Sequence, residues 1–151
     1  MSKKRTPSPT KPLVGTWRLI SMETRTPSGE TKHPWGRAVV GRLTYSSNGQ
    51  MCVQIMKANR LSFSSEDLEA GTAEEIQAAF DGYHAYFGTY SFDGRARAVI
   101  HRVEGSLFPN WMGREQMRSV KVSARRLILT SSPILFGGQE EVFLTVWDRI
   151  K

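Results

Sequence analysis

The chain of 151 residues is predicted to be an all-β protein, in which short antiparallel strands close into a barrel or sandwich with one inserted helix. Three observations predict this fold. Short apolar runs bounded by turn residues recur from residue 13 onward, two turn sequences are typical of β-hairpins, and one segment alone has helical periodicity. Apolar residues make up 39% of the chain, which is enough for one core in a single domain of this length.

The first twelve residues are expected to form a basic, disordered arm (residues 1–12), followed by the barrel domain (residues 13–151). The arm has three prolines, four Lys or Arg and no acid. It lacks the apolar core of a secretory signal peptide, whereas a transit peptide stays open because the arm is basic and free of acids. The single Cys52 excludes an intramolecular disulfide framework, so we expect a cytoplasmic protein.

The net charge of +7 is unevenly distributed. Taking the four bases of the arm from the total of 21 leaves 17 bases against 14 acids, so the body carries only +3. Residues 61–94 contain seven acids and no Lys or Arg. We therefore expect no nucleic-acid partner, and the lack of any run near 18 apolar residues predicts no membrane span.

The first part of the body is predicted to be an antiparallel meander. A strand over residues 14–23 ends at a Pro-Ser-Gly turn, and a second strand covers residues 37–45. The sequence Ser-Asn-Gly at residues 47–49 is typical of a hairpin turn. It joins the second strand to a third over residues 50–56.

One helix is expected over about residues 73–86. Thr72 and Glu75 have the spacing of a capping box, and acidic residues in the first turn suit the helix dipole. Apolar residues then recur at helical spacing and predict one apolar stripe, namely Ile76, Ala79, Phe80, Tyr83 and Phe87.

Strands are predicted again after the helix, which brings the total to about eight or nine. An Asp-Gly turn at residues 93–94 separates the first two of them, and a loop over residues 105–113 follows. The strand ranges are 86–92, 96–104, 115–122, 126–131 and 142–149.

No standard catalytic signature is present, and the sequence predicts neither a cofactor nor a metal site. GxSxG, HExxH and P-loop patterns are all missing. The three histidines, His33, His84 and His101, are far apart and share no ligand spacing.

Polar residues on otherwise apolar strand faces are the candidate functional groups. His101 shares one strand face with Val99 and Val103, so it is predicted to point inward. There it is either a hydrogen-bonded core histidine or a cavity-lining acid or base. Arg118 shares a face with Val120, and this leaves two readings open. It is a surface residue, or it faces inward and meets an anionic ligand, a carbonyl or a buried partner.

Tyrosines and a loop tryptophan complete the candidates. Tyrosines on strand faces offer apolar rings with one hydroxyl each, and Trp111 is placed to close or plug a barrel mouth. The face on which Gln54 and Met56 lie is ambiguous. The candidate ligand-binding residues are Tyr45, Gln54, Met56, Tyr83, Tyr86, Tyr90, His101, Trp111 and Arg118, of which His101, Tyr90 and Arg118 are also the candidate catalytic residues.

Five segments resemble, in the same order, the bacterial and fungal lipocalin-like domain family of calycin-type barrels. They are LVGTWRLIS (13–21), RLTYSSNGQMCVQIM (42–56), DGYHAYFGTYSFD (81–93), HRVEGSLFPNWMG (101–113) and LTVWDR (144–149). The first contains the G-x-W start of lipocalins. In that motif Gly15 would permit tight passage of the chain and Trp17 would plug the barrel base.

The resemblance implies an up-and-down antiparallel β-barrel of about eight or nine strands around a cavity for a small, mostly apolar molecule. The protein is then expected to bind such a molecule without catalysis, as a carrier or sensor. The alternative is a cofactor-independent cyclase, isomerase or dehydratase of specialised metabolism, with His101 as acid or base and Tyr or Arg side chains polarising a carbonyl. An outer helix also makes a homodimer possible.

Overall fold

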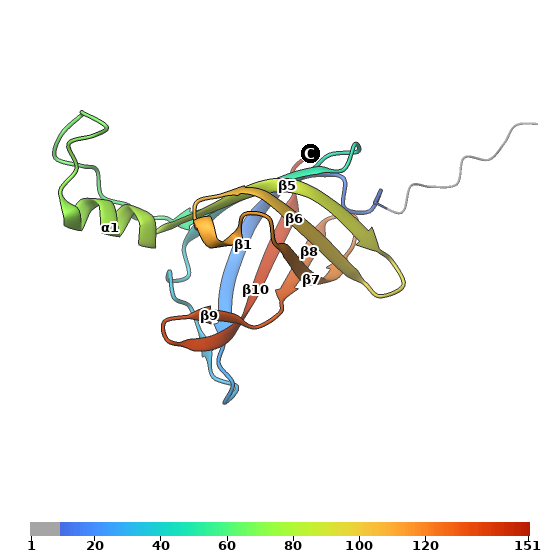
Figure 1. Cartoon of the computed structure of the whole chain (residues 1–151). Coiled ribbons are helices and arrows are strands. Elements are labelled where there is room, and N and C mark those ends of the chain that lie inside the picture. The colour runs from blue at the N-terminus through green and yellow to red at the C-terminus, as the bar shows by residue number, and fades with distance from the viewer. Residues whose placement is uncertain (1–9) are drawn as a thin grey trace, which may run out of the picture.

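A closed antiparallel barrel is the main feature of the computed structural model, which describes residues 10–151 (Figure 1). Within those residues ten strands form one sheet in the order β2-β1-β3-β4-β5-β6-β7-β8-β10-β9, and pairing of β1 with β10 closes it. Eight strands make the closed barrel, and the short β2 and β9 pair at its margin. The strands are β1 (Gly15–Arg25), β2 (Thr31–Lys32), β3 (Val39–Tyr45), β4 (Gln50–Lys57), β5 (Tyr83–Asp93), β6 (Ala98–Ser106), β7 (Glu115–Val122), β8 (Arg126–Ser131), β9 (Ile134–Phe136) and β10 (Gln139–Arg149).

The predicted fold class is confirmed. Neighbouring strands follow one another along the chain, as an up-and-down barrel requires, and β7 and β8 have the predicted bounds. The hairpin between β3 and β4 closes at the predicted turn, where the Ser46 N–H donates to the Gln50 carbonyl and Gly49 has a φ of 84°. The expected disordered arm lies outside the described residues up to residue 9, and residues 10–13 form a turn.

The predicted helix was wrong in its length. Helix α1 covers Ala73–Asp81, and Gly82 ends it. Tyr83 already begins β5, where it pairs with Met56 of β4. Sheet pairing along β5 therefore overrides the local helical spacing that had placed Tyr83 and Phe87 on the helix.

The helix start follows the prediction, but its packing does not. The Glu75 N–H donates to Thr72 Oγ1 at 3.2 Å and the Thr72 N–H donates to Glu75 Oε1 at 3.0 Å, which forms the capping box. No residue of α1 is buried, and the helix projects away from the barrel (Figure 1). The expected apolar stripe thus contributes almost nothing to the core.

Trp17 and Arg149 seal one end of the barrel. Trp17 is fully buried, and its indole N–H donates to the Leu13 carbonyl at 2.9 Å. The Arg149 guanidinium lies 4.1 Å from the centroid of the Trp17 ring. Gly15 has a φ of 140°, and a Cβ there would lie 2.6 Å from Arg149 Nη1, so only glycine fits.

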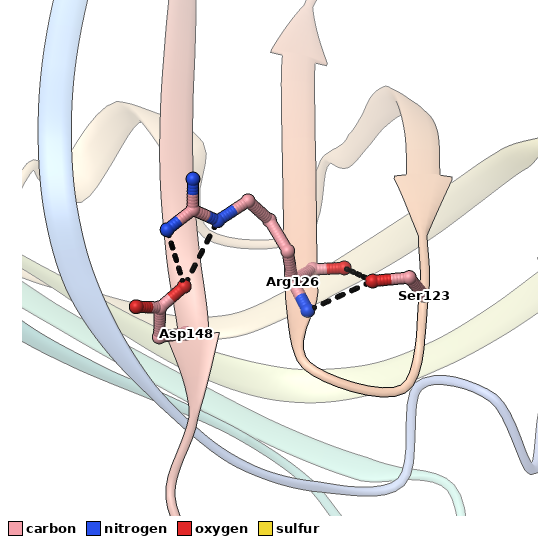
Figure 2. A network of polar contacts seen from close by, with 3 residues as sticks. All are labelled: Ser123, Arg126 and Asp148. Atoms are coloured by element: carbon pink, nitrogen blue, oxygen red, sulfur yellow. Dashed lines mark hydrogen bonds and ion pairs between the residues drawn. The ribbon is translucent and has the colours of Figure 1, made fainter.

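A small polar network ties the β7–β8 turn to β10 (Figure 2). The Arg126 N–H donates to Ser123 Oγ at 3.1 Å, which closes the turn. The Arg126 side chain donates from Nε to Asp148 Oδ1 at 2.9 Å. This network holds the last two barrel strands in register on the solvent side.

Two further features concern the described chain as a whole. Between residues 10 and 151, no helix is long and apolar enough to cross a membrane. In the same range no group of three or more His, Cys, Asp or Glu side chains is arranged to hold a metal ion.

Candidate functional site

A cavity of about 350 Å³ lies inside the barrel. Small-molecule sites in proteins commonly measure roughly 300–1,000 Å³, so this cavity suits a ligand of modest size. Inward-facing residues of the barrel strands form its walls, among them Leu43, Val53, Ile55 and Leu129. Segments outside the barrel also contribute, namely the end of α1, the loop at residues 107–111 and the β9 hairpin at residues 134–137.

Aromatic rings supply much of the lining. Trp111 meets His84 edge-on, with ring centroids 4.8 Å apart and an interplanar angle of 83°, and it lies 5.9 Å from the Tyr86 ring. Phe136 and Phe143 form a second edge-on pair at 5.2 Å. Rings held in this way offer both faces and edges to a flat aromatic ligand.

A hydrogen-bonded triad of Tyr45, His101 and Tyr86 lies at the polar side of the cavity. The Tyr45 hydroxyl is 2.6 Å from His101 Nε2, and the Tyr86 hydroxyl is 2.6 Å from His101 Nδ1. The three residues come from β3, β6 and β5, and each is buried. His101 is the central residue of this triad, so its imidazole is a fully hydrogen-bonded inward histidine.

Arg118 of β7 lies on the inner face of the barrel. Of the two alternatives left open by the sequence, the inward position is therefore the one observed. It lines the cavity, and its Nη1 donates to the Met117 carbonyl at 3.1 Å and to Gln116 Oε1 at 3.4 Å. Among the ion pairs of the described residues, none includes Arg118. An inward guanidinium without a carboxylate partner is suited to an oxygen-bearing ligand.

His84 is a site residue that the sequence reasoning missed. It lines the cavity, and its Nε2 is buried without a hydrogen-bond partner in the described structure. The signal was present, because His84 has the same strand parity as Tyr86 and Tyr90 on β5. In the structure the His84 ring packs against the rings of Trp111 and Tyr86.

The two cavity histidines are neutral at physiological pH. Burial, assisted by the charge of Arg118, lowers the pKa of His101 to about 3 and that of His84 to about 4. Burial raises the pKa of Tyr86, while the positive charge of Arg118 acts in the opposite direction. Arg118 is therefore the one positive charge of the cavity lining.

The other candidate residues are placed differently. Tyr83 lies at the cavity, and its hydroxyl donates to Gln54 Oε1 at 3.3 Å. Tyr90 is buried but does not line the cavity, because its hydroxyl donates to the Ser46 carbonyl at 2.7 Å. Gln54 and Met56 do not line it either, since Met51, Val53 and Ile55 take the inward positions of β4 and leave the alternate positions outside. Tyr45 contacts the site only through His101.

A closed eight-stranded barrel with one largely apolar internal cavity defines a class of small-molecule-binding β-barrels. The model of the lipocalin-like domain family matches residues 14–150. The chain belongs to that family, which confirms the resemblance drawn from its five segments.

Similar proteins have been described. A curated relative from Aspergillus oryzae, named as a 4'-hydroxy-3'-methoxypropiophenone carrier protein, is 32% identical over 107 residues, which cover 66% of this chain and 96% of the relative. A crystal structure of a lipocalin-like protein from Bacteroides uniformis aligns with 92% of this chain and 99% of its own, with 14% identity and a TM-score of 0.47. The REP1-NXSQ fatty acid transporter aligns with 92% of this chain and 96% of its own, with 14% identity and a TM-score of 0.41.

Proposed function

We propose that the protein is a non-catalytic carrier of a small, mostly apolar molecule that contains an aromatic ring and is held inside the barrel. The observation that carries this proposal is the cavity of about 350 Å³ lined largely by apolar and aromatic side chains. Edge-on pairs such as Trp111 with His84 present an aromatic surface against which a flat ring can pack. The Aspergillus oryzae relative is named as the carrier of an aryl ketone, which supports the same ligand class.

The hydrogen bonding of the candidate catalytic residues favours binding over acid–base catalysis. Both ring nitrogens of His101 are held by tyrosine hydroxyls at 2.6 Å, so neither is free to exchange a proton with a ligand. The Tyr90 hydroxyl is held by the Ser46 carbonyl outside the cavity. A carrier needs only the cavity and its polar side, and both are present without further groups.

Blocking the cavity is expected to abolish binding. Val53 points inward and lines the cavity, so Val53→Trp would fill the space that the ligand needs. We expect the affinity for 4'-hydroxy-3'-methoxypropiophenone, measured by isothermal titration calorimetry, to fall by more than about tenfold. Cys52→Trp is the matched control, because Cys52 is the adjacent residue on the exposed face of the same strand. Equal affinity of both variants would contradict binding inside the barrel.

A homodimer in the cytoplasm completes the proposal. The feature in its favour is the exposed apolar surface of α1, where Ile76 and Phe80 are 55% and 44% exposed. Sedimentation velocity should give twice the mass of one chain, and Ile76→Glu should return the protein to a monomer. A single species of monomer mass at high protein concentration would contradict this part of the proposal.

A further inference from the structure

We infer that Tyr86 and Arg118 donate hydrogen bonds to one carbonyl or anionic oxygen of the bound molecule, and that His101 positions the Tyr86 hydroxyl for it. The inference rests on the proposed carrier function and specifies what the carried molecule must present. Its basis is the direction of the protons along the triad of Tyr45, His101 and Tyr86.

The direction of hydrogen-bond donation along the triad is fixed at Tyr45. This residue is 1% exposed, and among the described residues His101 Nε2 is the sole hydrogen-bond partner of its hydroxyl. If Nε2 carried the imidazole proton, Nε2–H would donate to Tyr45, and the tyrosine proton would be buried without an acceptor. Buried polar groups are strongly selected to be paired. Tyr45 therefore donates to Nε2.

The proton of the neutral imidazole then lies on the other nitrogen. A neutral histidine has one N–H and one acceptor nitrogen, and Nε2 is the acceptor here. Nδ1–H consequently donates to the Tyr86 oxygen at 2.6 Å. The Tyr86 oxygen is thus an acceptor toward His101, and its own proton is free to be donated elsewhere.

Arg118 points to the same assignment from the other side. A guanidinium has no acceptor, so Arg118, which lines the cavity with Tyr86 and whose charge acts on it, cannot take the Tyr86 proton. With His101 donating to it and Arg118 unable to accept, the Tyr86 hydroxyl directs its proton toward the cavity. Both Tyr86 and Arg118 line the cavity, and that side is where the ligand lies.

The chemistry of the recognised group follows from this geometry. Tyr86 O–H and Arg118 N–H can both donate to one acceptor oxygen of the ligand, and the guanidinium has no acceptor of its own. The charge on Arg118 strengthens such hydrogen bonds in a site of low polarity. An aryl ketone oxygen and a carboxylate both satisfy these donors, whereas a methylene group leaves them unpaired.

Three probes test the inference, of which the first two share the same substituted ring and the third carries a carboxylate on a propylphenyl ring. They are 4'-hydroxy-3'-methoxypropiophenone, its methylene analogue 2-methoxy-4-propylphenol, and 4-propylbenzoate as the anionic form. Titration calorimetry should show the ketone or the carboxylate binding about ten- to a hundredfold more tightly than the methylene analogue. A ketone preference identifies the neutral ligand class, and a carboxylate preference identifies the anionic one.

Variants then assign the preference to the two donors. Tyr86→Phe and Arg118→Met should each reduce the preference for the oxygen-bearing probe by about five- to tenfold and leave the affinity for the methylene analogue within about twofold. An unchanged preference in both variants would overturn the inference while the carrier function stands. If none of the three probes binds the wild-type protein, the proposed function itself is contradicted.

The role of His101 has a direct spectroscopic test. Nitrogen-15 NMR of the imidazole should show the Nδ1-protonated neutral form of His101 at pH 7. A proton on Nε2 would overturn the assigned direction of the triad.

Discussion

Lowering the pH from 6.5 to 4 is expected to lower the free energy of unfolding of this protein by several kcal/mol. His101 and His84 have pKa values of about 3 and about 4 in the folded state, compared with the ordinary value of 6.5. Between these values the unfolded chain binds a proton at each residue and the folded protein does not. The free energy of unfolding therefore falls as the pH falls, by about 1.4 kcal/mol per pH unit for each histidine.

The sum of the two contributions is large in comparison with ordinary protein stability. At pH 4 the two histidines together would lower the free energy of unfolding by roughly 6 kcal/mol, whereas single domains are stable by about 5–15 kcal/mol. The loss begins near the unfolded pKa and is nearly complete at the folded values. Urea unfolding at half-unit pH steps, followed by circular dichroism, would measure the slope.

Single substitutions divide this slope between the two histidines. His84→Gln and His101→Gln should each remove about half of the pH dependence between 6 and 4, because each removes one proton-binding group from the difference. His33→Gln is the control, since His33 lies at the surface of the barrel near Glu23 and outside the cavity. Stability that stays constant across this pH range would contradict burial of two neutral histidines.

Most of the barrel could be predicted from local sequence patterns. Short runs between loop and turn residues predicted the bounds of β7 and β8 at residues 115–122 and 126–131. Period-two alternation placed His101 on the inner face with Val99 and Val103, and all three are buried. These predictions needed no knowledge of distant segments.

The end of the helix and the partners within the site could not be predicted in this way. Tyr83 fits a helical stripe locally, but its pairing with Met56 draws it into β5. Tyr45 and His101 are 56 residues apart in sequence, so their contact depends on the closure of the whole barrel. The strand parity of His84 indicates the inner face, but its contact with Trp111 depends on a distant loop and could not be predicted.

The faces of Gln54 and Arg118 show a further limit of sequence patterns. Residues on β4 and β7 alternate, but both faces of these segments contain apolar and polar side chains. Only the pairing of β4 with β3 and of β7 with β6 fixes which set points inward. Arg118 turns inward and Gln54 outward, although the two patterns were equally ambiguous.

Replacing Trp17 by alanine is expected to be the most damaging single substitution in the barrel. The indole is fully buried at the sealed end, and its removal would leave a cavity in the core of Trp17, Leu13 and Leu43. Loss of a buried tryptophan costs about 3–5 kcal/mol. The substitution also removes the ring on which Arg149 lies, and Arg149 holds the segment before β1 through hydrogen bonds to the Pro12 and Val14 carbonyls.

Trp35 is the matched control for this prediction. It is a tryptophan that is only partly buried and lines the cavity, so Trp35→Ala should cost much less stability and weaken ligand binding instead. Urea unfolding of both variants, together with titration of the aryl ketone, separates the two effects. If Trp17→Ala lowered the free energy of unfolding by less than about 1 kcal/mol, the proposed role of the sealed end would be contradicted. Such a small loss would mean that the barrel does not depend on the contact between Trp17 and Arg149.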